Sequence, residues 1–444
     1  MNSSPTPFRL TELLKEARER TLAVVADLDD EEMIGPRLNI VNPLRWEIGH
    51  IAWFQEYWIL RHMHGRAPML AGGDSLYDSA RVAHEIRWDL PLPTKAEAMN
   101  YMQSVLDQVV DLYSQKEDAA ELSDDDTYFL SLVLLHEDMH AEAITYTRQT
   151  LAFSAPRFNP VDESARTHSP VKELTDDPLC DVEIPGGLFL LGSIPGKRFA
   201  FDNEMAAHEV QVQPFKISRT AVINAQYAAF VGDGGYERQE LWSDAGWRWR
   251  ESTGAKHPVY WRFIDGKWWR RYFNEMVQLE DYLPVLHVNW YEADAFCRWA
   301  GRRLPTEAEW EVAAGAEPRT DGHGITTHKR QFPWGDEAPT PDRANLDWHS
   351  MGCIDVRALP SGDSAFGCRQ MIGNVWEWIA SDFKPYPGFV AGPYKEYSAP
   401  WFGYHKVLRG GCWATRSHLI HNNYRNFYTP DRRDLWAGFR TCAV

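Results

Sequence analysis

The chain has 444 residues, 44% of them hydrophobic and 25% charged, which is typical of a globular protein with two or three domains. The formal net charge of −17 disfavours a nucleic-acid partner, since a basic face is hard to build on such a balance. The six cysteines have no C-x-x-C spacing, residues 1–20 are polar, and no run of about eighteen apolar residues occurs, so we expect a cytoplasmic protein with no membrane partner.

Apolar residues recur every three or four positions in the first third of the chain, which is the periodicity of helices with one buried face. This pattern predicts four helices, at residues 8–28, 43–63, 95–113 and 124–151. Four helices of this length predict a helix bundle over residues 1–151.

The last of these helices contains two histidines four residues apart, His136 and His140. On a helix they lie on one face and supply half of a metal site. A third histidine, His50, lies in the predicted helix at 43–63, and helix bundles build metal sites from side chains on facing helices. The sequence therefore predicts a metal site formed by His50, His136 and His140. The alternative is that the pair at 136 and 140 only forms hydrogen bonds.

The same segment matches the H-E-x-x-H pattern of zinc proteases. A protease needs a third ligand in a known place, and Tyr146 stands where the extended form of the pattern requires a histidine. We therefore expect Glu137 to face solvent or to support a ligand rather than to act as a general base. A zinc hydrolase and a non-catalytic binding module remain alternatives.

The character of the chain changes after the fourth predicted helix. Residues 152–178 are rich in Pro, Ser, Thr and acids and predict a linker. In residues 179–444, strand-like runs at 184–193 and 208–212 precede a region rich in Gly, Trp and turn residues, with helices expected at 290–300 and 306–314. The predicted fold class is α+β, with a helix bundle followed by a mixed domain.

Motifs in the second part follow one another in the order of a known fold. They include Ile184-Pro185-Gly186-Gly187, Arg303-Leu304-Pro305-Thr306-Glu307, Gly373-Asn374-Val375-Trp376-Glu377-Trp378, Leu408-Arg409-Gly410-Gly411 and Gly438-Phe439-Arg440. This part resembles the formylglycine-generating-enzyme (sulfatase-modifying factor) domain, a relative of C-type lectins, and the first part resembles the DinB-like four-helix bundle. Joined in this order, the two resemble the ergothioneine sulfoxide synthase family over nearly the whole chain.

The resemblance implies a non-haem iron(II) enzyme whose partners are hercynine, which is the trimethylated betaine of histidine, a thiol or other chalcogen donor, and O2. In the family, three histidines hold the iron, and the product is a sulfoxide at C2 of the imidazole. His50, His136 and His140 match these ligands. A set of ligands on one face of the metal leaves positions open for substrates and O2.

The formylglycine-generating enzymes themselves are disfavoured by the residues at their catalytic positions. Their copper-binding thiols correspond to Thr415 and Ile420 in this chain. Cys412 lies nearby, and we interpret it as a small buried side chain. The resemblance to these enzymes therefore implies their fold without their thiol chemistry.

A quaternary ammonium group such as that of hercynine is best held by aromatic faces and carboxylates. By resemblance, Asn426 and Phe427 are the candidate hercynine-binding residues, whereas most other aromatic residues, including Trp376 and Trp378, are expected in the core. The family also uses a tyrosine as proton donor. Tyr386 is the selected match, and Tyr394 and Tyr397 are alternatives.

The residues that would bind the second substrate depart from the branch that uses gamma-glutamylcysteine. Met139 replaces a glutamine, Tyr428 replaces an acidic residue, and of two carboxylate-binding arginines Arg87 is retained while Leu90 stands for the other. Losing such contacts weakens binding of an anionic peptide thiol. The segment 77–93 resembles the selenoneine synthase branch, which implies a selenosugar donor. Cysteine or gamma-glutamylcysteine, giving an ergothioneine or ovothiol intermediate, is the alternative.

Overall fold

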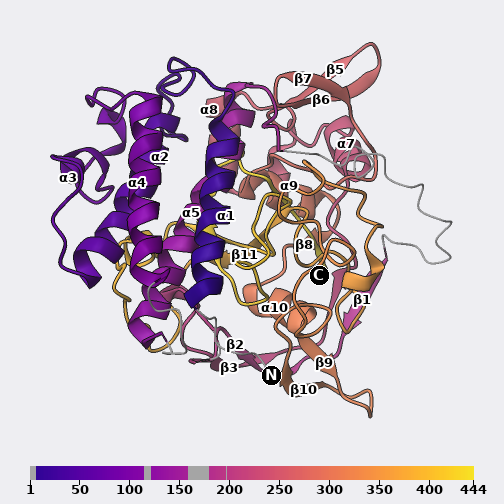
Figure 1. The fold of residues 1–444 in the computed structure, drawn as a ribbon. Helices are drawn as coiled ribbons and strands as arrows, with labels where there is room; N and C mark the ends of the chain where they lie inside the picture. Colours follow the sequence, from indigo (N-terminus) through magenta and orange to yellow (C-terminus); the bar gives the residue numbers. More distant parts are fainter. Residues whose placement is uncertain (1–6, 115–121, 159–179, 197) are drawn as a thin grey trace. The chain divides into compact units, whose positions relative to one another are not determined.

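The computed structural model describes residues 7–114, 122–158, 180–196 and 198–444 of the chain. The chain divides into two compact units, Met1–Pro160 and Val161–Val444 (Figure 1). The predicted linker, 152–178, lies outside the described residues from position 159 onward. Among the described residues, none of the helices is both long enough and apolar enough to cross a membrane.

The first unit is a helix bundle, as the periodicity predicted. Its long helices α1 and α2 each pack against both α4 and α5. The predicted helix at 43–63 is present as an α-helix that continues directly into a π-helical segment, η1. The elements are α1 (Pro7–Val25), α2 (Leu44–Gln55), η1 (Glu56–Met63), α3 (Gly73–Tyr77), the 3-10 turn η2 (His84–Ile86), α4 (Lys95–Ser114) and α5 (Asp124–Leu151).

Local signals at its two ends set the length of α5, the helix that carries two of the candidate metal ligands. At the start, the Ser123 hydroxyl accepts from the backbone N–H of Asp126, and the Asp126 carboxylate accepts from the Ser123 backbone N–H. This reciprocal capping box satisfies two backbone donors, and three acidic residues in the first turn favour the helix dipole. At the end, Ala152 adopts a left-handed conformation with φ 58° and stops the helix.

Apolar faces of the bundle helices meet in a buried core. The residues of this core are Val24, Val25, Leu28, Met33, Leu44, Ile48, Ile51, Ala52, Ala98, Met102 and Ile144. Because α2 and α5 both contribute to it, the packing of apolar side chains fixes the face that each of these helices turns toward the other.

In its described residues, the second unit combines five small sheets with short helices and long loops, which confirms the α+β class. The helices are α7 (Asn224–Gly232), α8 (Asp244–Thr253), α9 (Trp290–Trp299) and α10 (Glu307–Gly315). The 3-10 turns are η3 (Asp202–Glu204), η4 (Gln239–Leu241), η5 (Pro360–Gly362) and η6 (Ala399–Trp401). The strands are β1 (Asp181–Ile184), β2 (Gly187–Leu191), β3 (His208–Val212), β4 (Phe215–Ser218), β5 (Trp261–Ile264), β6 (Lys267–Tyr272), β7 (Glu275–Gln278), β8 (Arg302–Arg303), β9 (Ala316–Pro318), β10 (Ile325–Lys329), β11 (Trp376–Asp382), β12 (Lys406–Arg409), β13 (Asn426–Tyr428), β14 (Ala437–Phe439) and β15 (Cys442–Ala443).

One sheet positions the segment predicted to bind substrate. Its strand order is β13-β12-β11-β14, and β12 pairs antiparallel with β13 so that Val407 lies opposite Phe427. The central strand β11 carries Trp376 and Trp378, which are buried, as predicted for core residues. Its strand β12 ends at Arg409 of the Arg-Gly-Gly motif, so the motif and the candidate substrate segment belong to one sheet.

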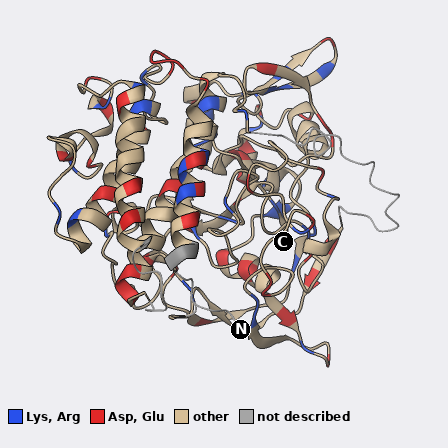
Figure 2. Cartoon of the chain, viewed as in Figure 1, with Lys and Arg blue, Asp and Glu red and all other residues tan. Residues whose placement is uncertain are grey.

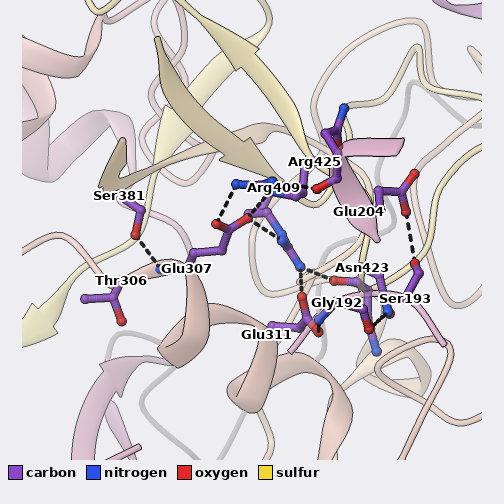
Figure 3. Close-up of polar contacts among 12 residues, drawn as sticks. Gly192, Ser193, Glu204, Thr306, Glu307, Glu311, Ser381, Arg409, Asn423 and Arg425 are labelled. Atoms are coloured by element: carbon purple, nitrogen blue, oxygen red, sulfur yellow. Dashed lines mark hydrogen bonds and ion pairs between the residues drawn. The ribbon is translucent and has the colours of Figure 1, made fainter. Parts of the chain in front are cut away.

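Buried ion pairs connect the motifs of the second unit. Arg409 pairs with Glu307 at 2.8 Å and with Glu311 at 2.5 Å, and Arg425 pairs with Glu307 at 2.7 Å (Figure 3). Lys329 pairs with Glu311 at 2.5 Å. Arg425 is the residue directly before β13 in the sequence. Its pairing with Glu307 therefore holds the start of the candidate substrate segment against α10.

Charges of both signs occur along the helices of the first unit and in the loops of the second (Figure 2). Many lie in exposed local pairs such as Lys15 with Glu12 and Arg319 with Asp321. Pairs of this kind contribute little stability, so the buried network around Arg409 is the electrostatic feature that matters for the fold.

The buried network predicts a pH-dependent contribution to stability. Burial opposes ionisation of Glu311, but the charges of Lys329 and Arg409 outweigh it and lower its pKa from 4.5. A lowered folded-state pKa gives stability that is present above the unfolded-state pKa and is lost as the pH falls through the folded-state pKa. We therefore expect the urea midpoint of Glu311→Gln to lie below that of the wild type at pH 7 and the two to converge below pH 4.5. Glu183→Gln, which breaks the exposed pair with Lys216, is the control, and its urea midpoint should match that of the wild type at both pH values. An equal gap at both pH values would contradict the assignment.

Candidate functional site

The three predicted metal-ligating histidines come together inside the first unit. His50 projects from α2, and His136 and His140 project from α5. One ligand nitrogen from each lies within 4.8 Å of the others, and the Nε2 atoms of His136 and His140 are 3.2 Å apart. Two nitrogen ligands at right angles, each about 2.1 Å from a metal, are separated by about 3 Å. The spacing of His136 and His140 thus fits ligation of one ion.

Hydrogen bonds at the outer nitrogens determine which nitrogen of each ring is available. His50 Nδ1 lies 2.7 Å from the carbonyl oxygen of Tyr77, and His140 Nδ1 lies 2.5 Å from a carboxylate oxygen of Glu47. A carbonyl and a carboxylate can only accept, so both Nδ1 atoms carry the proton and both Nε2 atoms keep a lone pair. Together with His136, whose Nε2 lies 3.2 Å from that of His140, they bring three potential nitrogen ligands to one place, which supports a metal site.

The electrostatics of the cluster favour a cation. Burial, together with the charge of His140, lowers the pKa of His50 to about 3. Burial likewise lowers the pKa of His136 well below its ordinary value. Burial would raise the pKa of Glu47, but the charge of His140 and its hydrogen bond outweigh this and lower it to about 2. His50 and His136 are therefore neutral and Glu47 is ionised at neutral pH, the protonation states that metal binding requires of such residues.

Aromatic rings of α2 fix the orientation of two of the imidazoles. Phe54 stacks on His136 with ring centroids 3.6 Å apart and an interplanar angle of 5°, and Trp46 stacks on His50 at 4.7 Å and 9°. Stacked rings cannot rotate freely, so the imidazole planes are set before any metal binds.

The glutamate of the H-E-x-x-H pattern forms an ion pair that links α5 to α1 within the bundle. Glu137 is buried, and its two oxygens accept from Arg18 of α1 at 2.8 and 3.0 Å. The same guanidinium donates to Gln55 at 2.9 Å. The prediction that Glu137 could face solvent is therefore wrong. A carboxylate held by a buried arginine is poorly suited to take a proton from a metal-bound water, which argues against a zinc hydrolase.

A close approach between α2 and α3 supports His50. A Cβ atom on Gly49 would lie 2.2 Å from the Tyr77 ring, so only glycine lets this ring pack against the helix. Tyr77 is fully buried, and its carbonyl oxygen accepts from His50. No sequence pattern predicted that Gly49 and Tyr77 support the site, because their contact joins segments with no shared periodicity.

Arg87, the predicted carboxylate-binding residue, packs against the wall of the metal site. Its guanidinium lies 3.8 Å from the ring centroid of Trp46, and it donates to Asn42 Oδ1 at 2.7 Å and to the Val82 carbonyl at 3.1 Å. Met139, the other candidate in this unit, is half-buried on α5 directly before His140.

In the second unit, the candidate substrate residues Asn426, Phe427 and Tyr428 form strand β13 and are half-buried. Phe427 stacks on Phe383 at 3.9 Å and 9°, and the side-chain oxygen of Asn426 accepts from the Phe427 backbone N–H at 2.8 Å. The Tyr428 ring lies below the Arg432 guanidinium at 5.1 Å. Phe427 is thus part of an aromatic cluster that could contact a quaternary ammonium group.

The three candidate tyrosines differ in their surroundings. Tyr386 is buried, its ring lies 4.0 Å from the Arg425 guanidinium, and its hydroxyl has no hydrogen-bond partner among the described residues. The ring centroids of Tyr397 and Phe427 are 5.6 Å apart, and the Tyr397 hydroxyl lies 3.3 Å from that of Tyr424. Tyr394 stacks on Tyr397. Burial raises the pKa of Tyr386 and Tyr397 well above 10, so both carry a proton at neutral pH.

The two positions that the sequence resemblance matches to the thiols of formylglycine-generating enzymes are buried here. Thr415 and Ile420 are 1% and 0% exposed, and the Thr415 hydroxyl accepts from the Cys412 backbone N–H at 2.9 Å. Cys412 is fully buried, as predicted. These side chains are packed in the interior and offer no exposed thiol.

Known proteins share this arrangement of two units. Residues 13–144 match the DinB superfamily, and residues 168–443 match the sulfatase-modifying factor enzyme 1-like domain. The chain is 36% identical to a hercynine oxygenase of Mycolicibacterium thermoresistibile, over 98% of this chain and 95% of the relative, and 36% identical to one of Mycobacterium tuberculosis, over 98% of both. A formylglycine-generating enzyme of Streptomyces coelicolor is 33% identical over 59% of this chain and 88% of its own length.

The contact between Gly49 and Tyr77 predicts a specific loss. In Gly49→Ala the added methyl group collides with the Tyr77 ring, so the ring and its carbonyl must move away from His50. We expect a lower melting temperature and metal affinity reduced about tenfold or more, the range found when a ligand loses its supporting hydrogen bond. Calorimetry and metal titration measure the two effects. Gly232→Ala, where the backbone conformation is ordinary and the new Cβ meets no atom within 4 Å, is the control for adding a methyl group at a glycine. Wild-type metal affinity in Gly49→Ala would refute the role of this contact.

Proposed function

The chain belongs to the hercynine oxygenase family, and we propose that it is a non-haem iron(II) oxidoreductase that uses O2 to join a chalcogen atom to C2 of the hercynine imidazole. The cluster of His50, His136 and His140, in a chain that the relatives match over 98% of its length, is the observation that carries this proposal. Bound by three neutral imidazoles, iron(II) would supply the redox chemistry for O2 and open positions for both substrates.

We propose that hercynine is held by the segment around Phe427. Its trimethylammonium group cannot donate a conventional hydrogen bond and is attracted by aromatic faces. The cluster of Phe427, Phe383 and Tyr397 offers such faces on half-buried strand β13 and its surroundings. Asn426, next to Phe427, adds an amide for the polar part of the substrate.

The favoured chalcogen donor is a selenosugar, with cysteine or gamma-glutamylcysteine as the alternative. A peptide thiol with several carboxylates is best bound by forked arginine contacts. Arg87 already donates to Asn42 and to the Val82 carbonyl, and Leu90 stands where a second arginine would be needed. A donor with hydroxyl groups and fewer carboxylates suits these residues better.

The proposed function is tested by anaerobic loading with iron(II), addition of air and hercynine, and mass spectrometry with a selenosugar, cysteine or gamma-glutamylcysteine in parallel. We expect a selenium adduct of hercynine to form faster than either sulfur adduct. Removing the metal with a chelator, or replacing His136 by Ala, should abolish product and oxygen uptake. Glu12→Gln, which breaks an exposed ion pair with Lys15 in the same unit, is the control and should retain activity.

Each outcome of this assay assigns a function. A dominant sulfoxide would assign the chain to ergothioneine or ovothiol synthesis and reject the selenosugar. No adduct and no oxygen uptake with any donor would reject the oxygenase proposal and leave a zinc hydrolase or a binding module.

A proton donor is needed because reduction of O2 consumes protons, and we propose Tyr397 for this role. The sequence resemblance selected Tyr386, but the contact of Tyr397 with Phe427 supports Tyr397 instead. We expect Tyr397→Phe to lower kcat at least about 100-fold, the ordinary contribution of a general acid, and to divert the donor to simple oxidation. Tyr386→Phe and Tyr394→Phe are the matched controls. A comparable loss in Tyr386→Phe, with Tyr397→Phe unaffected, would return the role to Tyr386.

A further inference from the structure

We propose that Arg87, Asn42 and Glu47 form a relay that orients His140 and sets the metal affinity of the centre, so that Arg87 is a positioning residue of the metal site rather than a clamp for the chalcogen donor. This inference rests on the metal site of the proposed function. It adds three residues, none of them a ligand, that determine how the site binds its ion.

The relay is a continuous chain of hydrogen bonds. His140 Nδ1 donates to one carboxylate oxygen of Glu47 at 2.5 Å, and Asn42 Nδ2 donates to the other at 2.5 Å. Arg87 Nη1 donates to Asn42 Oδ1 at 2.7 Å. A guanidinium can only donate, so Arg87 fixes the orientation of the Asn42 amide, and the amide in turn presents its N–H group to Glu47. Every contact in the chain therefore has one possible direction.

A second route joins Arg87 to another ligand. The Arg87 guanidinium covers one ring face of Trp46, and Trp46 stacks on His50. Trp46 is itself held by its indole N–H, which donates to the Leu76 carbonyl at 2.8 Å. Arg87 thus supports His140 through hydrogen bonds and His50 through a stack of rings.

Burial makes the relay necessary. Glu47 is 5% exposed and Arg87 is 9% exposed. A buried carboxylate is costly unless both of its oxygens are satisfied, and here His140 and Asn42 satisfy one each. A carboxylate at the outer nitrogen of a ligating histidine fixes the tautomer and strengthens the inner nitrogen as a donor to the metal.

The guanidinium of Arg87 is already committed to these contacts. Its Nη1 donates to Asn42 and its Nη2 donates to the Val82 carbonyl at 3.1 Å, so both terminal nitrogens already hold a protein acceptor. A forked contact with a substrate carboxylate needs two adjacent N–H donors. The guanidinium is only 9% exposed and lies against the Trp46 ring, which disfavours such a contact with a substrate.

The test measures metal affinity in the full-length protein without any substrate, by anaerobic titration with cobalt(II) followed by visible absorption and with iron(II) by competition. We expect Glu47→Gln, which keeps an acceptor and removes the charge, to weaken binding about 10- to 100-fold and to shift the cobalt absorption bands. Asn42→Ser and Arg87→Met should weaken binding about tenfold. Glu12→Gln, which removes the acid of the exposed pair with Lys15 in the same unit, is the control and should leave affinity and spectrum unchanged.

The outcomes separate this inference from the proposed function. Wild-type affinity and spectrum in both Glu47→Gln and Arg87→Met would overturn the relay and return Arg87 to substrate binding. If the wild type binds neither ion, the metal centre itself is rejected, and the relay with it. Far-UV circular dichroism of the metal-free variants reports folding. Should Glu47→Gln not fold, Asn42→Ser decides the question, because it leaves the carboxylate in place.

Discussion

The gathering of three imidazoles between α2 and α5, with His50 and His136 buried and His140 half-buried, is the constraint on which the first unit depends. Imidazole nitrogens taken out of water need partners, and the inner nitrogens of this cluster face one another rather than a protein acceptor. The outer nitrogens of His50 and His140 are therefore anchored by the Tyr77 carbonyl and by Glu47. Anchored in this way, the cluster is arranged to receive an ion before one arrives.

In the second unit, the motifs that most clearly reveal the family maintain the fold rather than the chemistry. Arg409 of the Arg-Gly-Gly motif is fully buried and neutralises Glu307 and Glu311 of α10. Gly410 has φ 93°, and a Cβ there would lie 2.5 Å from the Met371 carbonyl oxygen, so the turn after β12 requires glycine. These demands hold whether or not thiols follow the motif. This explains how the chain shares its second unit with formylglycine-generating enzymes while Thr415 and Ile420 occupy their thiol positions.

The sequence predicted what depends on periodicity and on residue type. Apolar spacing located the four long helices of the first unit to within a few residues, and the i, i+4 spacing placed His136 and His140 on one face. The sequence did not predict the supports of the site. Glu47 lies 93 positions from His140, and Asn42 lies 45 positions from Arg87, so no local pattern joins them. Arg87 shows the difference most clearly, because the family resemblance implied a carboxylate clamp, whereas no sequence pattern indicated its partners in the structure, which are the Trp46 ring, the Asn42 amide and the Val82 carbonyl.

The position of Arg87 also bears on how the proposed metal site could serve different donors. The segment at 77–93 supplies the Tyr77 carbonyl to His50 and the Arg87 side chain to the relay, so it is part of the metal site as well as the predicted donor-binding segment. Substitutions at positions 77 and 87 are constrained, because Tyr77 supports His50 and Arg87 supports His140 through the proposed relay. They are freer at Leu90, which is half-buried and belongs to neither support. On this view, a change of donor arises by replacing residues such as Leu90 around a fixed scaffold, which alters recognition of the donor while the imidazole cluster stays intact.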